Sequence, residues 1–586
     1  MPEKIAKISK NLAEFKVEPN LKNYEETYQS FKWEDIRPEI KYFEDGKINA
    51  ARVAIDKHMK TPARQKLALL WENEAGEVKK FTFEEIFELA NKIANILKKL
   101  GVQKGDRVFL FLPRIPELYY SFLGILKTGA IAGTLFQAFG PEGIKDRLGN
   151  SKARFLITHS TLVGRVQEIK NDLPALEKII VVDQNFDNFD FQKEMTAASP
   201  EFETAPMAVD DRAFMLYTSG TTGKPKGVVH SHQAVIQEYL TAKWVLDIHP
   251  EDMYWCTADP GWVTGIAYEI LGSWAVGATA LIFDGRFDPD KWYLLIDKYN
   301  VTIWYTAPTA IRMLMKAGTK IVQKYSLKTL RHLASVGEPL NPEAIRWALE
   351  AFGSDKPFHD NWWQTETGAI CIANYPTMEI KVGSMGKPFP GVKAGIVDDE
   401  GNELPNGKEG NLALRPGWPS MMKEIWENPE KYQSYFIYPE QGRGKNNWYI
   451  SGDRAWRDED GYFWFMGRAD DVIKTAGERV GPFEVESALL EHPQVAEAGV
   501  IGKPDPERGE IIKAFCVLKP GFEGTEELKK EISAMVKKNL AGHAYPKEIE
   551  FTKTLPKTRS GKIMRRVLKA KELGLPVGDI STLEEY

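Results

Sequence analysis

The stretch YTSGTTGKPKG, residues 217–227, carries more information about this chain than any other part of its sequence. It follows the apolar residues 214–216 and precedes the apolar pair Val228 and Val229, so a strand is expected on each side of it. Glycines let a loop turn tightly and direct backbone N–H groups at an anion, while hydroxyl and lysine side chains add donors and positive charge. This combination predicts a loop that binds a polyphosphate.

The loop differs from the P-loop of Walker-type nucleotide-binding proteins. That motif has four residues between its glycines and Ser or Thr after its Lys. Here two residues separate Gly220 from Gly223, and Pro225 follows Lys224. A solvated turn rich in Gly, Ser and Thr is the alternative interpretation, but the order of these residues favours a phosphate site.

Composition argues against several other kinds of protein. The net charge of the 586 residues is −5, and no basic stripe of the kind that nucleic acid attracts is present. The most apolar segment, 122–136, is short and contains Lys127, and the N-terminus has no apolar stretch typical of a signal peptide. Three widely spaced cysteines fit neither a disulfide framework nor a zinc site. We therefore expect a cytoplasmic protein without a nucleic-acid or membrane partner.

Short apolar strands alternate with amphipathic helices in the first part of the chain. Strands are expected at residues 67–71, 78–81, 108–112, 155–158 and 179–182, and a further apolar segment spans 131–135. One helix is expected to begin at a capping box of Thr82 and Glu85 and to end at Gly101, and another to span 116–127. This alternation predicts largely parallel sheets covered by helices. Near the C-terminus, strands at 500–502 and 511–518 and a helix from Thr525 predict a small α+β domain.

Further segments follow the loop in a fixed order. They are VGEPLN at 336–341, NWWQTETG at 361–368, SGD at 451–453, GRADD at 467–471, AGERVGPFE at 476–484 and PKTRSGKIMRR at 556–566. Together with the loop, they resemble the signature motifs of the adenylate-forming superfamily, which contains acyl-CoA synthetases, the adenylation domains of peptide synthetases and luciferases. The chain is shorter than the long acetate-activating members and resembles a compact bacterial and archaeal branch.

The resemblance implies an α/β fold in two domains. A large N-terminal domain, residues 1–469, would contain helix-covered, largely parallel sheets and a β-barrel-like subdomain. A small, mobile α+β domain, residues 470–586, would turn about a hinge at Asp470.

The resemblance also assigns the nucleotide site. Residues expected to bind the phosphates of ATP are Thr218, Ser219, Gly220, Thr221, Thr222, Gly223, Lys224 and Thr365. Residues expected to bind adenine and ribose are Gly337, Glu338, Pro339, Asn361, Trp362, Gln364, Asp453 and Arg468. Glu366 and Thr218 would hold Mg²⁺, which prefers a carboxylate together with substrate phosphate oxygens.

Lys562 is the catalytic residue that the resemblance implies. A basic segment near a chain end is usually solvated, but in this family the Lys after Ser-Gly enters the active site. Its ammonium would bridge the acid and the α-phosphate, a contact worth about 4 kcal/mol at about 4 Å and a dielectric near 20. That energy corresponds to about a thousandfold in rate. Ala476, Gly477, Arg479 and Lys537 are the residues expected to contact CoA, with Arg165 as a further partner for its phosphates.

The acid pocket is expected to be walled by Val263, Thr264, Val336 and Trp363. In the acetate-activating members of the family an indole at this point blocks the pocket floor, so the resemblance implies that ATP, acetate and CoA give AMP, pyrophosphate and acetyl-CoA through an acetyl-adenylate. Trp363 as an ordinary core residue is the alternative interpretation. One methylene offers only about 0.8 kcal/mol of burial, so selectivity must come from steric exclusion.

Three other functions remain open from the sequence. The first is activation of propionate or isobutyrate. The second is the loading of a carrier-protein thiol by a free-standing enzyme, and the third is nucleotide binding without turnover by a sensor. A lysine acyltransferase and a deacylase are further expected partners, because acylation of Lys562 would remove its charge and stop adenylation.

Overall fold

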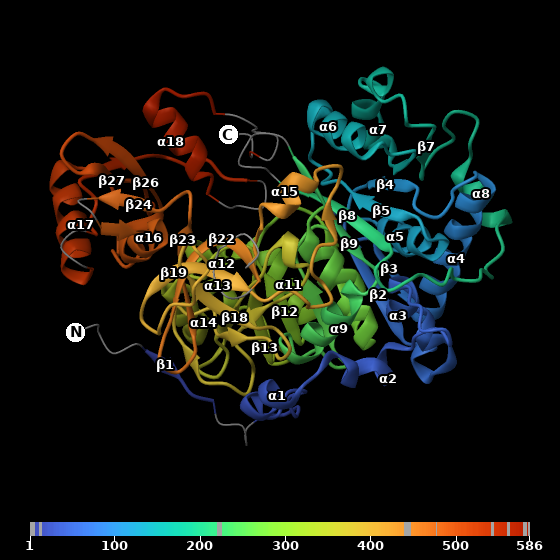
Figure 1. Ribbon diagram of the computed structural model, residues 1–586, viewed down its shortest axis with the longest axis horizontal. Coiled ribbons are helices and arrows are strands. Elements are labelled where there is room, and N and C mark those ends of the chain that lie inside the picture. Colours follow the sequence, from blue (N-terminus) through green and yellow to red (C-terminus); the bar gives the residue numbers. More distant parts are fainter. Residues whose placement is uncertain are drawn as a thin grey trace.

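Two large sheets, each with helices packed against it, form most of the protein in the computed structural model (Figure 1). The structure describes residues 6–10, 15–218, 225–438, 447–475, 478–540, 544–558, 563–577 and 583, without the side chain of Arg479.

The first large sheet has seven strands in the order β20-β9-β8-β5-β4-β6-β7. The strands are β4 (Arg107–Phe111), β5 (Ile131–Thr134), β6 (Phe155–Thr158), β7 (Lys178–Val181), β8 (Arg212–Thr218), β9 (Lys226–Ser231) and β20 (Glu424–Ile425). The pairs among β4, β5, β6, β7 and β8 are parallel, whereas β9 runs antiparallel to β8. The strands expected on either side of the loop are thus confirmed as β8 and β9.

The second large sheet has nine strands in the order β17-β15-β14-β13-β12-β10-β11-β2-β3. The strands are β2 (Leu67–Asn73), β3 (Val78–Thr82), β10 (Met253–Cys256), β11 (Thr279–Asp284), β12 (Ile303–Thr306), β13 (His332–Ser335), β14 (Phe358–Trp362), β15 (Ile372–Ala373) and β17 (Lys387–Pro388). Parallel pairing extends from β2 through β11, β10, β12 and β13 to β14. The predicted largely parallel sheets are therefore confirmed.

Alternate residues of the strands face different hydrophobic cores. Leu69 and Trp71 of β2 belong to a central core between the two sheets, whereas Leu70 belongs to a core on the outer face of the nine-stranded sheet. In β4, Leu110 faces the central core and Phe109 faces the outer core of the seven-stranded sheet. Burial on both faces explains why these strands read as continuous apolar runs.

Helices fill the three layers that these cores define. The central layer contains α4 (Phe83–Lys99), α5 (Pro116–Thr128), α9 (Ala234–Trp244), the π-helix η6 (Gly265–Leu271) and α10 (Gly272–Val276). The outer layers contain α6 (Pro141–Ser151), α7 (Ser160–Gln167), α11 (Pro289–Tyr299), α12 (Pro308–Ala317) and α14 (Pro342–Phe352). The capping box of Thr82 and Glu85 begins α4 as expected.

An antiparallel sheet follows the two large ones. It contains β18 (Ala394–Val397), β19 (Glu409–Leu414), β21 (Phe436–Ile437), β22 (Trp448–Arg457) and β23 (Phe463–Arg468). This five-stranded sheet corresponds to the β-barrel-like subdomain that was expected within the large domain.

A separate five-stranded sheet begins beyond Asp470. Its strands are β24 (Ile473–Thr475), β25 (Glu478–Val480), β26 (Val495–Asp505), β27 (Gly509–Leu518) and β28 (Glu548–Phe551). Its helices are α16 (Pro482–Leu490), α17 (Glu526–Asn539) and α18 (Arg565–Leu573). Figure 1 shows this red and orange unit on one side of the molecule, and its own hydrophobic core confirms the expected small α+β unit.

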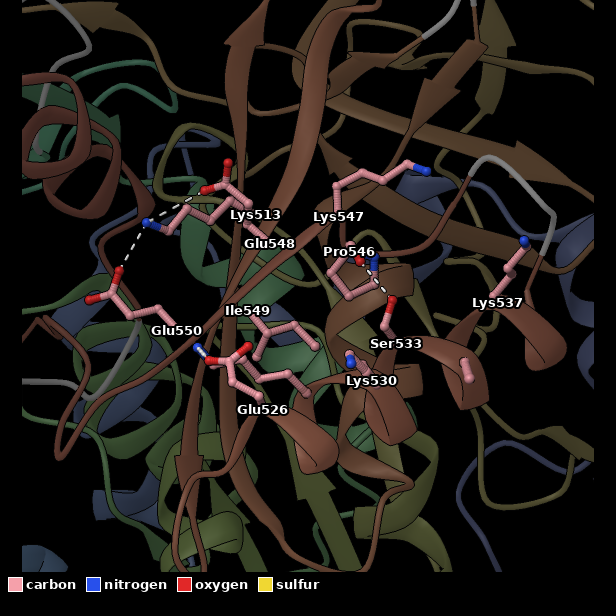
Figure 2. Close-up of a pocket in the computed structure, with 12 residues that line it drawn as sticks. Lys513, Glu526, Lys530, Ser533, Lys537, Pro546, Lys547, Glu548, Ile549 and Glu550 are labelled. Carbon is pink, nitrogen blue, oxygen red and sulfur yellow. Dashed lines mark hydrogen bonds and ion pairs between the residues drawn. The ribbon is translucent and has the colours of Figure 1, made fainter.

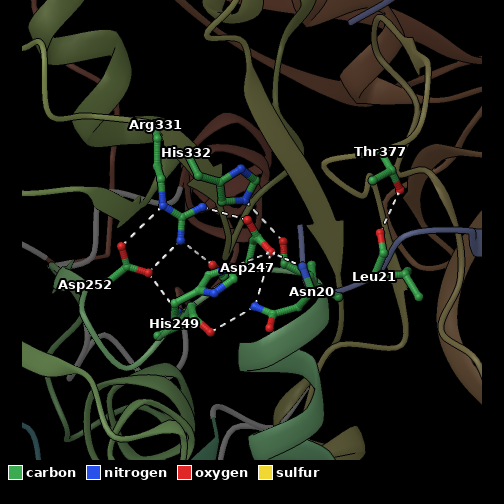
Figure 3. Close-up of polar contacts among 10 residues, drawn as sticks. Asn20, Leu21, Asp247, His249, Asp252, Arg331, His332 and Thr377 are labelled. Carbon is green, nitrogen blue, oxygen red and sulfur yellow. Dashed lines mark hydrogen bonds and ion pairs between the residues drawn. The ribbon is translucent and has the colours of Figure 1, made fainter. Parts of the chain in front are cut away.

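Hydrogen bonds around Asp247 connect the N-terminal segment to the nine-stranded sheet (Figure 3). Asp247 lies between α9 and β10, and Arg331 directly precedes β13. Asn20 donates its backbone N–H to Asp247 Oδ1 over 2.8 Å, and Arg331 Nη1 lies 2.6 Å from Asp247 Oδ2. Thr377 donates to the carbonyl of the adjacent Leu21 over 3.1 Å. Among the helices of the described residues, none has both the length and the apolar character needed to cross a membrane.

Candidate active site

Three residues of the expected nucleotide and acid sites lie where parallel strands end. Val336 directly follows β13, and Asn361 and Trp362 close the neighbouring strand β14. Thr306 ends β12, and its carbonyl accepts the N–H of Val336 over 3.1 Å. Carboxyl ends of adjacent parallel strands form the usual ligand-binding edge of an α/β sheet, so the structure brings these motifs together there.

Asp453 is the centre of the expected ribose site. Its Oδ2 accepts hydrogen bonds from Trp362 Nε1 over 2.9 Å and from Gln364 Nε2 over 3.1 Å. Arg468 Nε lies 3.4 Å from its Oδ1. Gly452, which precedes Asp453 in β22, has a φ of +75°, a conformation that favours glycine. Three other expected nucleotide residues therefore meet around the buried carboxylate of Asp453.

A second cluster surrounds Glu366. This residue lies in the short helix η7 (Thr365–Thr367), and Tyr435 donates its hydroxyl to Glu366 Oε1 over 2.9 Å. Lys226 Nζ donates to the same hydroxyl over 2.5 Å and lies 3.6 Å from the Glu366 carboxylate. Burial lowers the pKa of Lys226, and Glu366 opposes that effect.

Thr218 ends β8 opposite Lys226 of β9, at the entrance to the loop. Its Oγ1 is buried and has no hydrogen-bond partner within the described ranges. A buried hydroxyl without a partner loses free energy unless a ligand satisfies it. The role of Thr218 as a ligand of phosphate and Mg²⁺ remains a prediction.

Several expected residues lie outside the described part of the chain. They are Ser219, Gly220, Thr221, Thr222, Gly223 and Lys224 of the loop, Ala476 and Gly477, and Lys562; the side chain of Arg479 is also outside it.

The expected adenine segment borders the small C-terminal unit. Arg312 Nη2 donates to Glu338 Oε2 over 2.7 Å, and Thr309 donates to the other oxygen of that carboxylate. Asn341 Nδ2 donates to Ser487 Oγ of α16 over 2.9 Å. Glu338 and Pro339 line a cavity together with Ile563, the residue after Lys562. Gly337 has a φ of +101° and open space at its Cα.

Trp363 is part of an aromatic cluster with Tyr305 and Tyr268. Its Nε1 donates to Tyr305 Oη over 3.3 Å, and its ring meets the Tyr268 ring edge to face at 5.2 Å. Val263 and Val336 belong to the buried core against which Trp363 packs. Thr264 is the residue that precedes η6.

The two expected CoA-phosphate partners have different surroundings. Lys537 lies on α17 and lines a surface cavity, around which Figure 2 shows Lys530 and Lys547 as well. Arg165 Nη1 instead donates to the carbonyls of Gln137 at 2.8 Å and Phe139 at 3.2 Å. Its guanidinium thus supports the loop after β5.

Asp470 lies between β23 and β24, which belong to different sheets. Arg468 Nε is 3.7 Å from Asp470 Oδ1, so one guanidinium contacts both the expected ribose residue and the expected hinge residue. Gly481 packs against β23, where an added Cβ would lie 2.2 Å from Met466 O. The segment that follows Arg479 therefore touches the sheet that carries Asp453.

Sequence reasoning missed Tyr435, Tyr305 and Tyr268. None of them belongs to one of the quoted motifs, and only the fold brings them to Glu366 and Trp363. Lys226 is one of the two lysines expected to add positive charge to the loop, but its contacts with Tyr435 and Glu366 were not predicted.

Comparisons with known proteins agree with this geometry. The AMP-binding enzyme family matches residues 55–426, and the AMP-binding enzyme C-terminal domain matches residues 484–562. An acetyl-coenzyme A synthetase of Bacillus subtilis is 55% identical over 97% of this chain and 98% of that protein. Another from Methanothrix thermoacetophila is 45% identical over 93% of this chain and 86% of that protein.

Solved structures show the same architecture. An anthranilate CoA ligase in complex with anthranoyl-AMP has a TM-score of 0.82 and 32% identity, and it covers 93% of this chain and 99% of its own. An acyl-CoA synthetase of Brucella canis has a TM-score of 0.72 and 34% identity over 94% of this chain and 99% of its own. The predicted α/β fold with a large N-terminal and a small C-terminal domain is thereby confirmed, and the chain belongs to the AMP-binding enzyme family, in the branch that contains these acetyl-coenzyme A synthetases.

Proposed function

We propose that this protein is an AMP-forming acetate–CoA ligase, which converts ATP, acetate and CoA into AMP, pyrophosphate and acetyl-CoA through an acetyl-adenylate. The observation that carries the proposal is the 55% identity to an acetyl-coenzyme A synthetase along almost the full length of both chains. The contact of Trp362 with Asp453 and the position of Trp363 directly after β14 support it.

In the first half-reaction, a carboxylate oxygen of the acid attacks the α-phosphate of ATP and pyrophosphate leaves. Asp453 would accept hydrogen bonds from the ribose hydroxyls while Trp362 and Gln364 hold its carboxylate in place. The main chain at Gly337, Glu338 and Pro339 would border the adenine, and Asn361 would support this edge. Positioning and charge neutralisation supply most of the catalysis in phosphoryl-group chemistry of this kind.

The phosphates would lie on the loop and on Thr365. In the sequence, the loop residues 219–224 lie between Thr218, which ends β8, and β9, which begins at Lys226. Lys226, held by Tyr435 and Glu366, adds positive charge at the base of this loop.

Mg²⁺ fits the residues at this point. Thr218 offers a buried hydroxyl that lacks a partner in the described structure, and Glu366 offers a carboxylate fixed by Tyr435. A hard cation accepts such oxygen ligands together with phosphate oxygens, and it would neutralise charge on the departing pyrophosphate.

Lys562 would stabilise the charge that builds up between the acid and the α-phosphate. Support comes from its neighbour Ile563, which lines the cavity shared with Glu338 and Pro339. Acylation would remove the charge of Lys562, so a lysine acyltransferase and a deacylase are proposed as regulators of this step.

The second half-reaction requires CoA at the same site. We take residues 1–469 as the large domain and 470–586 as a small domain that turns about Asp470, a hinge motion of an established type. Ala476, Gly477 and Arg479 would then border the thiol arm, and Lys537 would contact a CoA phosphate. The contact of Gly481 with Met466 and the lysines around Lys537 support these assignments.

The acid is proposed to be acetate because Trp363 would close the pocket formed with Val263, Thr264 and Val336. Propionate is the second candidate, since a pocket of this kind discriminates against one methylene by only about 1–3 kcal/mol.

The test is turnover of the purified protein with ATP, Mg²⁺ and CoA against acetate, propionate, isobutyrate, hexanoate and benzoate. We expect the highest kcat/KM with acetate, a lower value with propionate and no turnover of the larger acids. A larger acid as the preferred substrate would contradict the proposed position of Trp363 but not the adenylation chemistry.

A further inference from the structure

Two buried tyrosines hold the Trp363 indole from different directions. Tyr305 Oη accepts the indole N–H over 3.3 Å, and the Tyr268 ring packs edge to face against the indole at 5.2 Å with an interplanar angle of 83°. The two tyrosine rings also pack against each other at 5.7 Å and 89°. The side chains of Tyr305 and Tyr268 are fully buried, so neither tyrosine can move toward solvent together with the indole.

The hydroxyl of Tyr305 has a fixed hydrogen-bond direction. It donates to Asn361 Oδ1 over 2.9 Å, and Asn361 Nδ2 donates to the carbonyl of Ser335 over 2.8 Å. Because the proton of Tyr305 is used toward Asn361, a lone pair of its oxygen is available to the indole N–H. Three strands, β12, β13 and β14, thus position one indole nitrogen.

Tyr268 is fixed in a similar way at the opposite side. Its Oη accepts the N–H of Ile370 over 2.8 Å and lies 2.8 Å from Thr241 Oγ1. Tyr268 belongs to the π-helix η6, which begins directly after Thr264. Single π-turns are rare and frequently occur at functional sites, and here the widened turn carries the ring that contacts Trp363.

We propose that Tyr305 is a positioning residue for acid selectivity, which, together with Tyr268, holds the Trp363 indole in the orientation that closes the acid pocket to acids longer than acetate. This inference rests on the proposed function. Without the Tyr305 hydroxyl, the indole N–H would have no acceptor in this arrangement, and the ring would gain freedom to turn away from the position where it excludes an additional methylene.

The test compares kcat/KM for acetate and propionate in Tyr305→Phe and in the unchanged protein. The ratio of propionate to acetate should rise about two- to tenfold, the range that corresponds to the net contribution of one hydrogen bond. The matched control is Tyr293→Phe, which removes an equally buried hydroxyl that has no partner among the described residues. It should leave the ratio unchanged.

A double-mutant cycle separates an effect through Trp363 from a general loss of packing. Trp363→Phe has no indole N–H, so adding Tyr305→Phe to that variant should change the ratio no further. The KM for ATP, measured in the same variants, reports any effect that passes through Asn361 instead.

Two results would overturn the inference: an unchanged ratio in Tyr305→Phe, or an equal change with and without the indole. A protein that does not prefer acetate before any substitution would instead contradict the proposed function, so the two failures are distinguishable.

Discussion

Replacing Asp453 with asparagine should weaken the binding of ATP through its ribose while the fold is retained. Trp362 Nε1 and Gln364 Nε2 both donate to Oδ2 of this carboxylate. The single oxygen of an asparagine can accept both hydrogen bonds, and its NH₂ group then replaces Oδ1 on the side of Arg468. An NH₂ group cannot accept a hydrogen bond from a ribose hydroxyl.

The loss of ATP affinity can be estimated from the charge of the Asp453 carboxylate, which accepts the hydrogen bond from the ribose. A hydrogen bond to an ionised group contributes about 1.5–3 kcal/mol, which corresponds to about a tenfold to hundredfold rise in KM for ATP. The assay is acid-dependent formation of AMP with ATP, 2′-deoxy-ATP and 3′-deoxy-ATP. The unchanged protein should discriminate against at least one deoxy analogue, and Asp453→Asn should discriminate less.

Asp458→Asn is the matched control. Asp458 is also a largely buried carboxylate, but it pairs with Lys381 over 2.6 Å, so its substitution should leave the KM for ATP unchanged. Our reasoning would be refuted if Asp453→Asn bound ATP as well as the unchanged protein, or if it discriminated against the deoxy analogues to the same extent.

Three further predictions concern the phosphates, the catalytic lysine and acid stability. Thr218→Val should raise the KM for MgATP severalfold without lowering the melting temperature, because the hydroxyl has no partner in the described structure; a lower melting temperature with normal kinetics would argue against a ligand role. Lys562→Ala should slow adenylation by about a thousandfold but leave the attack of CoA on supplied acetyl-adenylate intact, and equal loss of both steps would contradict the role. Burial lowers the pKa of His232 to about 3, and its Nδ1 accepts the N–H of Ala50, so below about pH 6.5 the unfolded chain binds a proton that the folded chain does not. The free energy of unfolding should therefore fall by about 1.4 kcal/mol per pH unit from this residue between pH 6.5 and 3, and urea titrations should show that His232→Asn removes that part of the slope.

Local sequence patterns predicted those parts of the fold that depend on neighbouring residues. The helix α4 begins at the expected capping box because Thr82 and Glu85 satisfy backbone groups within one turn. The expected strand at 108–112 is present as β4 (Arg107–Phe111), displaced by one residue, because Pro113 limits the strand but does not determine its last hydrogen bond. The helix expected from Thr525 is present as α17.

The contacts that complete the site were not predictable in this way. Tyr435 reaches Glu366 from 69 positions further along the chain, and Tyr305 reaches Trp363 across 58 positions. Such pairs depend on strand order and register, which no local periodicity specifies. The π-helix η6 was not predictable from the sequence either, because its apolar residues also fit an ordinary buried α-helix.

The formation of an acetyl-adenylate is tested most directly by the fate of the acetate oxygens. The purified protein would be incubated with ATP, Mg²⁺, CoA and acetate labelled with ¹⁸O in both oxygens, and the AMP and inorganic phosphate would be analysed by mass spectrometry. Because a carboxylate oxygen attacks the α-phosphate and remains on it when the thiolate attacks the carbonyl carbon, one ¹⁸O should appear in AMP for each acetyl-CoA formed. Unlabelled AMP, or ADP together with ¹⁸O in inorganic phosphate, would contradict an adenylate intermediate.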